Sequence, residues 1–139
     1  MSPNGSADAA GIHHLGLVKG MVVEELGWDE DVDEDLRQEI MDGLDSDLVE
    51  ESQDAVDAVI LWLRDGDGDV VDLLIDSLTD LGKDGFLWVL TPKIGRPGYV
   101  PQSDLAEGVV AAGLGLTISA SVSKDWSAHK VVRPKSARK

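Results

Sequence analysis

Residues 55–93 constrain the fold of this chain more than any other part of its sequence. Asp57–Leu63 reads DAVILWL, a continuous apolar run rich in branched side chains, typical of a strand covered on both faces of a parallel sheet. The turn RDGDGD leads into a predicted helix over Asp69–Leu81, where apolar residues recur at helical spacing. Gly82–Gly85 is expected to cap that helix and turn the chain, and Phe86–Leu90 (FLWVL) to form a second buried strand. Two parallel strands joined by a helix form a right-handed βαβ unit.

The flanking segments extend this unit in both directions. GMVVEEL, at residues 20–26, predicts a first strand, and an acidic helix is predicted over Asp31–Asp42. Its buried face is expected to carry the apolar residues Val32, Leu36, Ile40 and Leu44. The C-terminal part predicts a helix at Asp104–Ala112 capped by Ser103, a strand at Leu116–Val122, a turn at Asp125–Ser127, and a last strand at His129–Val132.

This order of elements predicts a three-layer α/β domain with a mostly parallel sheet and an antiparallel C-terminal strand. We expect one domain over residues 13–135, between a flexible N-terminal tail (1–12) and a basic C-terminal tail (136–139). Trp62 and Trp88 stand within the two apolar runs, so core packing is their expected role.

The charge is divided unevenly along the chain. Residues 1–90 hold 24 acidic against 4 basic side chains, whereas residues 91–139 hold 3 acidic against 8 basic ones. The acidic part is expected either to act as a solvated surface or to attract a basic partner. Because phosphates would be repelled, nucleic acid is disfavoured as a partner.

Several classes of protein are disfavoured by what the sequence lacks. There is no cysteine, so disulfides and thiol chemistry are excluded. No apolar run reaches the ~18 residues of a membrane span, and no secretory signal is recognisable, so we expect a cytoplasmic protein without a membrane partner. His13 and His14 have no third ligand nearby, and no metal site is predicted.

Four segments resemble an actinobacterial domain-of-unknown-function family, family number 3052. They are ELGWDED (Glu25–Asp31), VILWLRDGDGD (Val59–Asp69), FLWVLTPKIGRPG (Phe86–Gly98) and DWSAHKVVRPK (Asp125–Lys135), and the resemblance covers roughly residues 15–135. It implies a compact Rossmann-like domain with no assigned activity. From Asp57 onward the pattern also resembles the C-terminal half of a class I methyltransferase.

The departure from methyltransferases concerns their cofactor. Those enzymes cradle S-adenosylmethionine with a glycine-rich turn after the first strand and an acidic residue at the end of the second. Here the first strand is followed by a single glycine, a bulky Trp28 and a run of carboxylates, and a second strand is not recognisable. The resemblance therefore implies a degenerate domain, for which S-adenosylmethionine is not expected and no catalytic residue is predicted.

Four groups of residues are candidates for binding. Our preferred site is the basic Gly/Pro loop with Lys93, Arg96 and Tyr99, because ligands of α/β sheets bind at the carboxyl ends of strands. Asp65 and Asp67 follow the preceding strand; their spacing is like that of a calcium loop but lacks its glycine and glutamate, so a turn and helix cap are favoured. The acidic docking face comprises Asp29, Glu30, Asp31, Asp33, Glu34 and Asp35. Trp28 and Trp126 are both placed in turns and are both candidates, and we expect one of them to line a pocket or contact surface.

These features lead to two main hypotheses. The first is a noncatalytic binding or regulatory module that docks a protein partner, itself basic, through the acidic helix and the basic loop. The alternative is a divergent transferase or sensor that binds a nucleotide-like small molecule at the strand ends. A third and weaker hypothesis is head-to-tail self-association into a homo-oligomer, driven by the same charge polarity.

Overall fold

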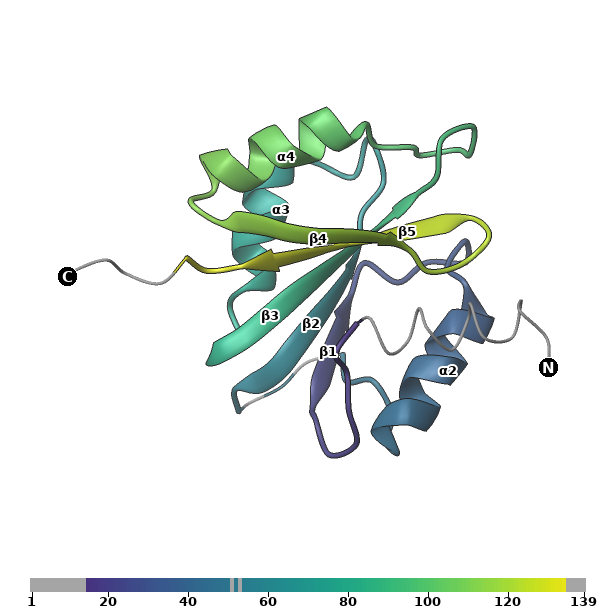
Figure 1. Cartoon of the computed structure of the whole chain (residues 1–139), viewed down its shortest axis with the longest axis vertical. Coiled ribbons are helices and arrows are strands. Elements are labelled where there is room, and N and C mark those ends of the chain that lie inside the picture. The colour runs from purple at the N-terminus through teal and green to yellow at the C-terminus, as the bar shows by residue number, and fades with distance from the viewer. Residues whose placement is uncertain (1–14, 51, 53, 135–139) are drawn as a thin grey trace.

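A computed structural model describes residues 15–50, 52 and 54–134 of the chain. Five strands form one sheet in the order β1-β2-β3-β5-β4, and three helices cover it (Figure 1). The elements are β1 (Val23–Leu26), α2 (Glu34–Leu44), β2 (Val56–Trp62), α3 (Val70–Ser77), β3 (Leu81–Pro92), α4 (Gln102–Ala111), β4 (Gly115–Ser121) and β5 (Trp126–Val132). The chain tails predicted at residues 1–12 and 136–139, and both His13 and His14, lie outside the described residues.

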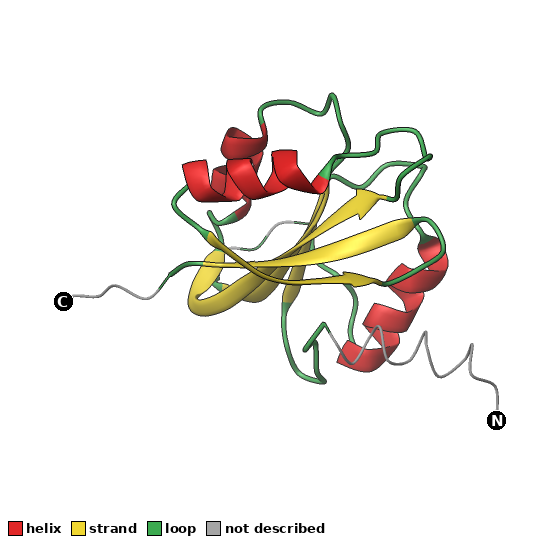
Figure 2. Ribbon diagram, turned by 45° about the horizontal axis from the view of Figure 1, so that its top comes forward, coloured by secondary structure: helices red, strands yellow, loops and turns green. Residues whose placement is uncertain are grey.

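The sheet has the predicted mixed topology. β1, β2 and β3 pair in parallel, while β5 runs antiparallel to both β3 and β4. Helices lie on both faces of the sheet, with α2 on one side and α3 and α4 on the other (Figure 2). The predicted three-layer Rossmann-like fold is therefore confirmed.

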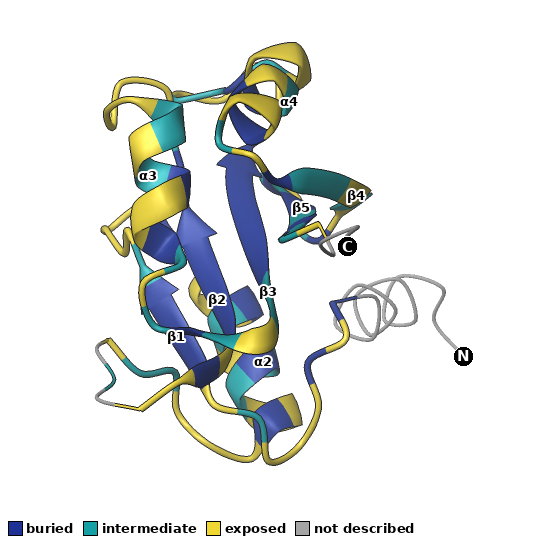
Figure 3. Cartoon of the chain, turned by 90° about the vertical axis from the view of Figure 1, so that its left-hand side faces the viewer, coloured by how far each residue is buried: buried dark blue, intermediate teal, exposed yellow. Residues whose placement is uncertain are grey.

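The apolar run of β2 has the expected physical cause. Successive side chains of a strand point to opposite faces. Ala58, Ile60 and Trp62 belong to the core beneath α2, whereas Val59 and Leu61 belong to the core beneath α3 and α4. Both faces of the strand are covered from Ala58 to Trp62, as Figure 3 shows for the buried central strands, so no polar position interrupts that part of it; Asp57, near its start, is exposed.

Aspartate caps set the starts of α2 and α3. The side chain of Asp33 accepts a hydrogen bond from the backbone N–H of Leu36 at 2.9 Å, and Asp69 accepts one from Asp72 at 3.2 Å. α2 therefore begins three residues after the predicted start at Asp31. The predicted apolar face is confirmed, because all four of its residues are buried: Val32, Leu36, Ile40 and Leu44.

The prediction for the end of α3 was wrong. The helix ends at Ser77, and Gly82 and Gly85 lie within β3 rather than in a cap and a turn. The register between β2 and β3 shifts here, and a Cβ on Gly85 would meet the Asp57 carbonyl oxygen at 2.8 Å. Glycine at this position reflects a crowded strand, and a sequence pattern does not distinguish that from a turn.

Two C-terminal predictions also need correction. α4 begins at Gln102 with Pro101 as its N-cap, so Ser103 lies inside the helix and caps nothing. Trp126 and Ser127 belong to β5, which starts three residues before the predicted strand and extends the antiparallel pairing with β3 as far as Pro92.

The N-terminal part completes the sheet at its β1 edge. Val49 forms an isolated parallel bridge with Glu24, where a further strand would lie. Its N–H donates to the Val23 carbonyl oxygen at 2.9 Å, and its carbonyl oxygen accepts from the Glu25 N–H at 2.7 Å. The strand that was not recognisable in the sequence after the first strand is thus represented by a single bridging residue, Val49. Within the described ranges, no helix is long and apolar enough to cross a membrane.

Candidate functional site at the carboxyl end of the sheet

Four connecting segments meet where the parallel strands end. The loops after β1, β2 and β3 reach this end because parallel strands share a direction. The Asp65 N–H donates to the Gly98 carbonyl oxygen at 2.9 Å, and the Lys93 N–H donates to the Asp125 carbonyl oxygen at 2.8 Å. These bonds join the β2–α3 loop to the β3–α4 loop, and the β3–α4 loop to the β4–β5 turn.

Arg64 is the centre of this end of the sheet. Its guanidinium makes a bidentate ion pair with Asp31, at 2.5 and 2.8 Å, and donates to the Gly27 carbonyl oxygen at 2.8 Å. The carbon at the centre of the guanidinium lies 5.6 Å from the ring centroid of Trp126. The hydrogen bonding between Arg64 and Asp31 raises the pKa of Arg64 and lowers the pKa of Asp31, so both side chains stay charged. Arg64 therefore fastens the acidic loop onto the end of β2.

A second, more buried network lies beneath the first. The Glu25 carboxylate accepts two bonds from Arg37, at 2.6 and 2.7 Å, and one from the Trp62 indole N–H at 2.8 Å. The bonds to Glu25 raise the pKa of Arg37, and the Glu25 side chain is almost completely buried. The Glu25 carboxylate at the end of β1 is thus bound by side chains of the same chain.

Gly27 explains the single glycine after the first strand. Its φ of 77° is left-handed, and a Cβ there would lie 2.4 Å from the Trp62 carbonyl oxygen. The glycine therefore permits close packing of the loop against the end of β2. The glycines of a cofactor loop, by contrast, let the backbone approach a bound phosphate group.

Trp28 lies on the rim of two open grooves rather than inside either. Its side chain is 51% exposed, and its indole N–H donates to Glu34 at 3.2 Å. One groove, of about 350 Å³, is lined by the ends of β1 and β2 and by residues of α3. The other, of about 680 Å³, is lined by the end of β1, by α2 and by the segment that includes Glu50. The bulky Trp28 therefore plugs neither groove.

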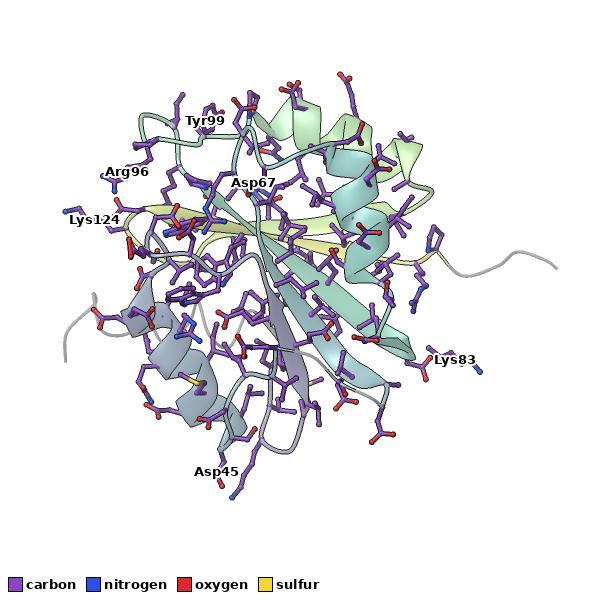
Figure 4. All side chains as sticks on the ribbon, turned by 180° about the vertical axis from the view of Figure 1, so that it is seen from behind. Asp45, Asp67, Lys83, Arg96, Tyr99 and Lys124 are labelled. Atoms are coloured by element: carbon purple, nitrogen blue, oxygen red, sulfur yellow. The ribbon has the colours of Figure 1, made fainter. Side chains whose placement is uncertain are left out.

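The basic loop after β3 borders the acidic loop. The Lys93 ammonium donates to the Ser121 hydroxyl, and Arg96 lies 3.4 Å from Asp125. Arg96, Lys124 and Tyr99 lie at the same end of the molecule, far from Lys83 (Figure 4). A small cavity of about 80 Å³ is lined by residues of both loops: Asp31, Pro92, Arg96, Pro97, Asp125 and Trp126. Asp31 of the acidic face and Arg96 of the basic loop thus border the same cavity.

The carboxylates of the DGDGD segment have structural partners. Asp67 accepts a bond from the Arg64 N–H at 2.9 Å, and Asp69 caps α3. Asp65 is exposed. A turn and a helix cap describe this segment, as favoured from the sequence. Across the described part of the chain, no three His, Cys, Asp or Glu side chains gather in a way that could hold a metal ion.

Trp126 lines the small cavity between the two loops and is otherwise buried. It is 4% exposed and stacks edge-on against Trp62, with ring centroids 4.8 Å apart. The sequence reasoning missed Glu25, Arg37 and Arg64 as the residues that organise the site. An acidic pair within an apolar strand was the available signal for Glu25, but its partners lie 12 and 37 residues away.

A row of hydrogen-bonded polar side chains connects the antiparallel strands. The buried His129 of β5 hydrogen-bonds Thr91 of β3 at 3.1 Å and Ser119 of β4 at 2.8 Å. Burial lowers the pKa of His129. The histidine ties three strands together through its side chain.

The described residues form a Rossmann-like α/β domain. The chain belongs to the DUF3052 family of proteins of unknown function, whose sequence profile matches residues 12–135. Among its relatives are the uncharacterized proteins Mb2263c of Mycobacterium bovis and Rv2239c of Mycobacterium tuberculosis, each 46% identical over 123 residues. These alignments cover 88% of this chain and 77% of each relative.

Solved methyltransferases share the fold at low sequence identity. A methyltransferase dependent on S-adenosylmethionine from Aquifex aeolicus superposes with a TM-score of 0.55 and 14% identity, covering 94% of both chains. The CcbJ methyltransferase of Streptomyces caelestis superposes with a TM-score of 0.58 and 10% identity, covering 91% of this chain and 89% of the CcbJ chain. A putative methyltransferase from Thermoplasma acidophilum superposes with a TM-score of 0.53 and 12% identity, covering 87% of this chain and 71% of the other. At this identity the likeness describes the fold alone.

Proposed function

We propose that this domain is a noncatalytic, cytoplasmic docking module that binds a protein partner at the carboxyl end of its sheet. One observation carries the proposal: the ends of β1 and β2 are occupied by the Glu25–Arg37 and Asp31–Arg64 ion pairs. In a Rossmann-like fold these strand ends are where a ligand would bind. With its own side chains there, the domain offers an outer surface with two open grooves rather than an enclosed cofactor pocket.

Two exposed apolar side chains give that surface its anchors. Trp28 is 51% exposed beside Asp29 and Glu30, and Ile94 is 79% exposed between Lys93 and Gly95. Large apolar or aromatic anchors surrounded by charge are typical of protein interfaces, where a few such residues carry most of the binding energy.

The charges on either side of the anchors indicate the chemistry of the partner. The acidic side includes Asp29, Glu30 and Asp35, all exposed, and the basic side includes Arg96 and Lys124. A matching partner presents lysine or arginine toward the first group and a carboxylate toward the second. Such complementarity speeds encounter and fixes orientation.

The test is a matched pair of charge reversals. Binding of proteins captured from the native cell extract is compared between K93E/R96E and the control K19E/K83E, whose lysines are exposed and lie away from the site. Both doubles change the net charge equally. Loss of a captured protein with K93E/R96E alone supports the proposal, and equal capture by both variants rejects a docking role for the loop.

A second function, binding of a nucleotide-like small molecule, is favoured by the 350 Å³ groove beside Trp28. Its size and its place at the strand ends suit a small ligand. Thermal unfolding with S-adenosylmethionine, its demethylated product, common nucleotides and calcium distinguishes the two functions. A ligand at 100 times its dissociation constant stabilises by about 2.7 kcal/mol, which moves the midpoint by several degrees. Such a shift would favour a sensor or transferase, and none with any compound would favour docking.

A further inference from the structure

The two edges of the sheet differ in whether their backbone groups are paired. At the β1 edge, Val49 takes up the backbone groups of Val23 and Glu25. At the opposite edge, β4 pairs only with β5 among the described residues, and its outer side has no strand beside it. Figure 3 shows β4 as the outermost strand, intermediate to exposed along its length. A strand in this position presents a row of backbone donors and acceptors.

The sequence of β4 gives this edge almost no protection against pairing. Natural edge strands are usually blunted by lysine, other charges or proline. Residues 109–123, VVAAGLGLTISASVS, contain neither charge nor proline, in a chain that is 28% charged. One bulge, between Leu116 and Ile118, interrupts the start of the strand and leaves the remainder regular. Ile118, in the middle of β4, is 46% exposed.

We propose that β4 pairs antiparallel with β4 of a second copy of this chain, which joins two sheets into one ten-stranded sheet. A second copy fits this edge because an uncharged antiparallel edge strand is its own complement across a two-fold axis. The chain carries a net charge of −15, so two copies repel each other through most of their surfaces. The uncharged β4 edge is where they can meet without bringing like charges together. The proposal does not depend on the docking function.

Symmetry makes the proposal specific. A continuous antiparallel pair of identical strands requires a two-fold axis perpendicular to the sheet, and one residue of β4 must then lie opposite its own copy. Directly opposed residues in such a pair have Cα atoms about 4.5–5.5 Å apart, within the range of about 4.4–6.8 Å that a disulfide spans. The chain has no cysteine, so any disulfide reports an introduced position.

The first experiment uses three single-cysteine variants, I118C, S119C and A120C, under mild oxidation. The control is I75C on α3, because Ile75 is 49% exposed and matches Ile118 in type and exposure. We expect a disulfide dimer at one of the three positions, formed faster than with I75C. Crosslinking of all three at the rate of the control would overturn the proposal.

The second experiment uses the cysteine-free chain, so that no introduced thiol is involved. Analytical ultracentrifugation over a wide concentration range should show a dimer that I118K converts to monomer and I75K does not, with both variants keeping the wild-type circular dichroism. A monomeric wild type, or an I118K that remains dimeric, would overturn the proposal. Because salt screens the repulsion between two acidic copies, added salt should strengthen the dimer. Weakening by salt would instead indicate head-to-tail attraction between opposite charges and also overturn it.

Discussion

Glu25 is the residue on which the geometry of the candidate site depends most. A buried carboxylate is tolerated only when it is paired and hydrogen-bonded, and here Arg37 and Trp62 supply three bonds. The sequence indicated a strand at this position, and its two adjacent acids were visible. The identity of the partners was not, because pairing across 37 residues follows from the packed sheet rather than from local spacing.

The first prediction concerns the loss of this pairing. Arg37→Ala leaves Glu25 buried without a counter-charge, so the free energy of unfolding should fall by about 3 kcal/mol or more. Urea denaturation measures the change. Lys19→Ala is the control, because the Lys19–Asp45 pair is exposed and should contribute less than about 1 kcal/mol. Equal effects of the two variants would contradict the structural role assigned to Glu25.

The second prediction separates backbone strain from crowding. Gly27 and Gly20 both have a left-handed φ, 77° and 95°, but only at Gly27 would a Cβ clash with backbone. Gly27→Ala should therefore be less stable than Gly20→Ala by about 1–3 kcal/mol, the usual cost of overpacking. Thermal unfolding of the two variants checks this, and similar midpoints would show that the loop does not pack on β2 as described.

The third prediction is a pH dependence caused by His129. Burial lowers its folded-state pKa, whereas the unfolded side chain takes up a proton near its ordinary pKa of about 6.5. Between these two values the unfolded state binds more protons, so the free energy of unfolding should fall as the pH falls from about 7.5 to about 5.5. His129→Gln should weaken this dependence. An unchanged slope in the variant would assign the effect to other groups.

At the scale of the elements, the apolar patterns predicted the existence and order of the five strands and three helices well. The boundaries were predicted less well, for physical reasons. β3 begins five residues before its predicted start, because Leu81 already pairs with Val56 of β2, and the crowded Gly82–Gly85 segment forms a register shift within the strand instead of a turn. β5 also starts early, because pairing with β3 continues through Trp126. Pairing partners decide where strands end, and local sequence does not contain them.

The helix caps give the fourth prediction. Asp33→Ala should lower the free energy of unfolding by about 1 kcal/mol, because its side chain satisfies a backbone N–H at the start of α2. Ser103→Ala should change it by less than about 0.5 kcal/mol, because Ser103 is exposed within α4 and caps nothing. Chemical denaturation of both variants is the measurement. A larger loss for Ser103→Ala would restore the cap predicted from the sequence.

At the scale of the whole molecule, the charge polarity was visible in the sequence, but its spatial arrangement was not. The acidic and basic candidate residues belong to different loops, and the shared direction of the parallel strands brings these loops to one end. The Arg64–Asp31 pair then joins the acidic loop to β2. The sequence contains no information on strand pairing, so it predicts separate acidic and basic faces. The fold brings the two loops to the same end of the sheet.

The fifth prediction follows from the net charge of −15. Repulsion among the many acids of residues 1–90 destabilises the compact state, and added salt screens it. Raising sodium chloride from about 50 to about 500 mM should therefore raise the unfolding midpoint, because the Debye length shrinks well below the spacing of most surface charges. A fall in the midpoint would mean that attractive ion pairs outweigh the repulsion.

The four tryptophans differ in exposure, so the intrinsic fluorescence of the protein can report on the candidate site. Trp62, Trp88 and Trp126 are buried, whereas Trp28 stands half in water beside a group of carboxylates. A cationic quencher of fluorescence, drawn to those carboxylates, reaches one of the four indoles and leaves the others bright. Whatever covers the end of the sheet would shield that indole, so occupancy can be followed through light emission without attaching a dye.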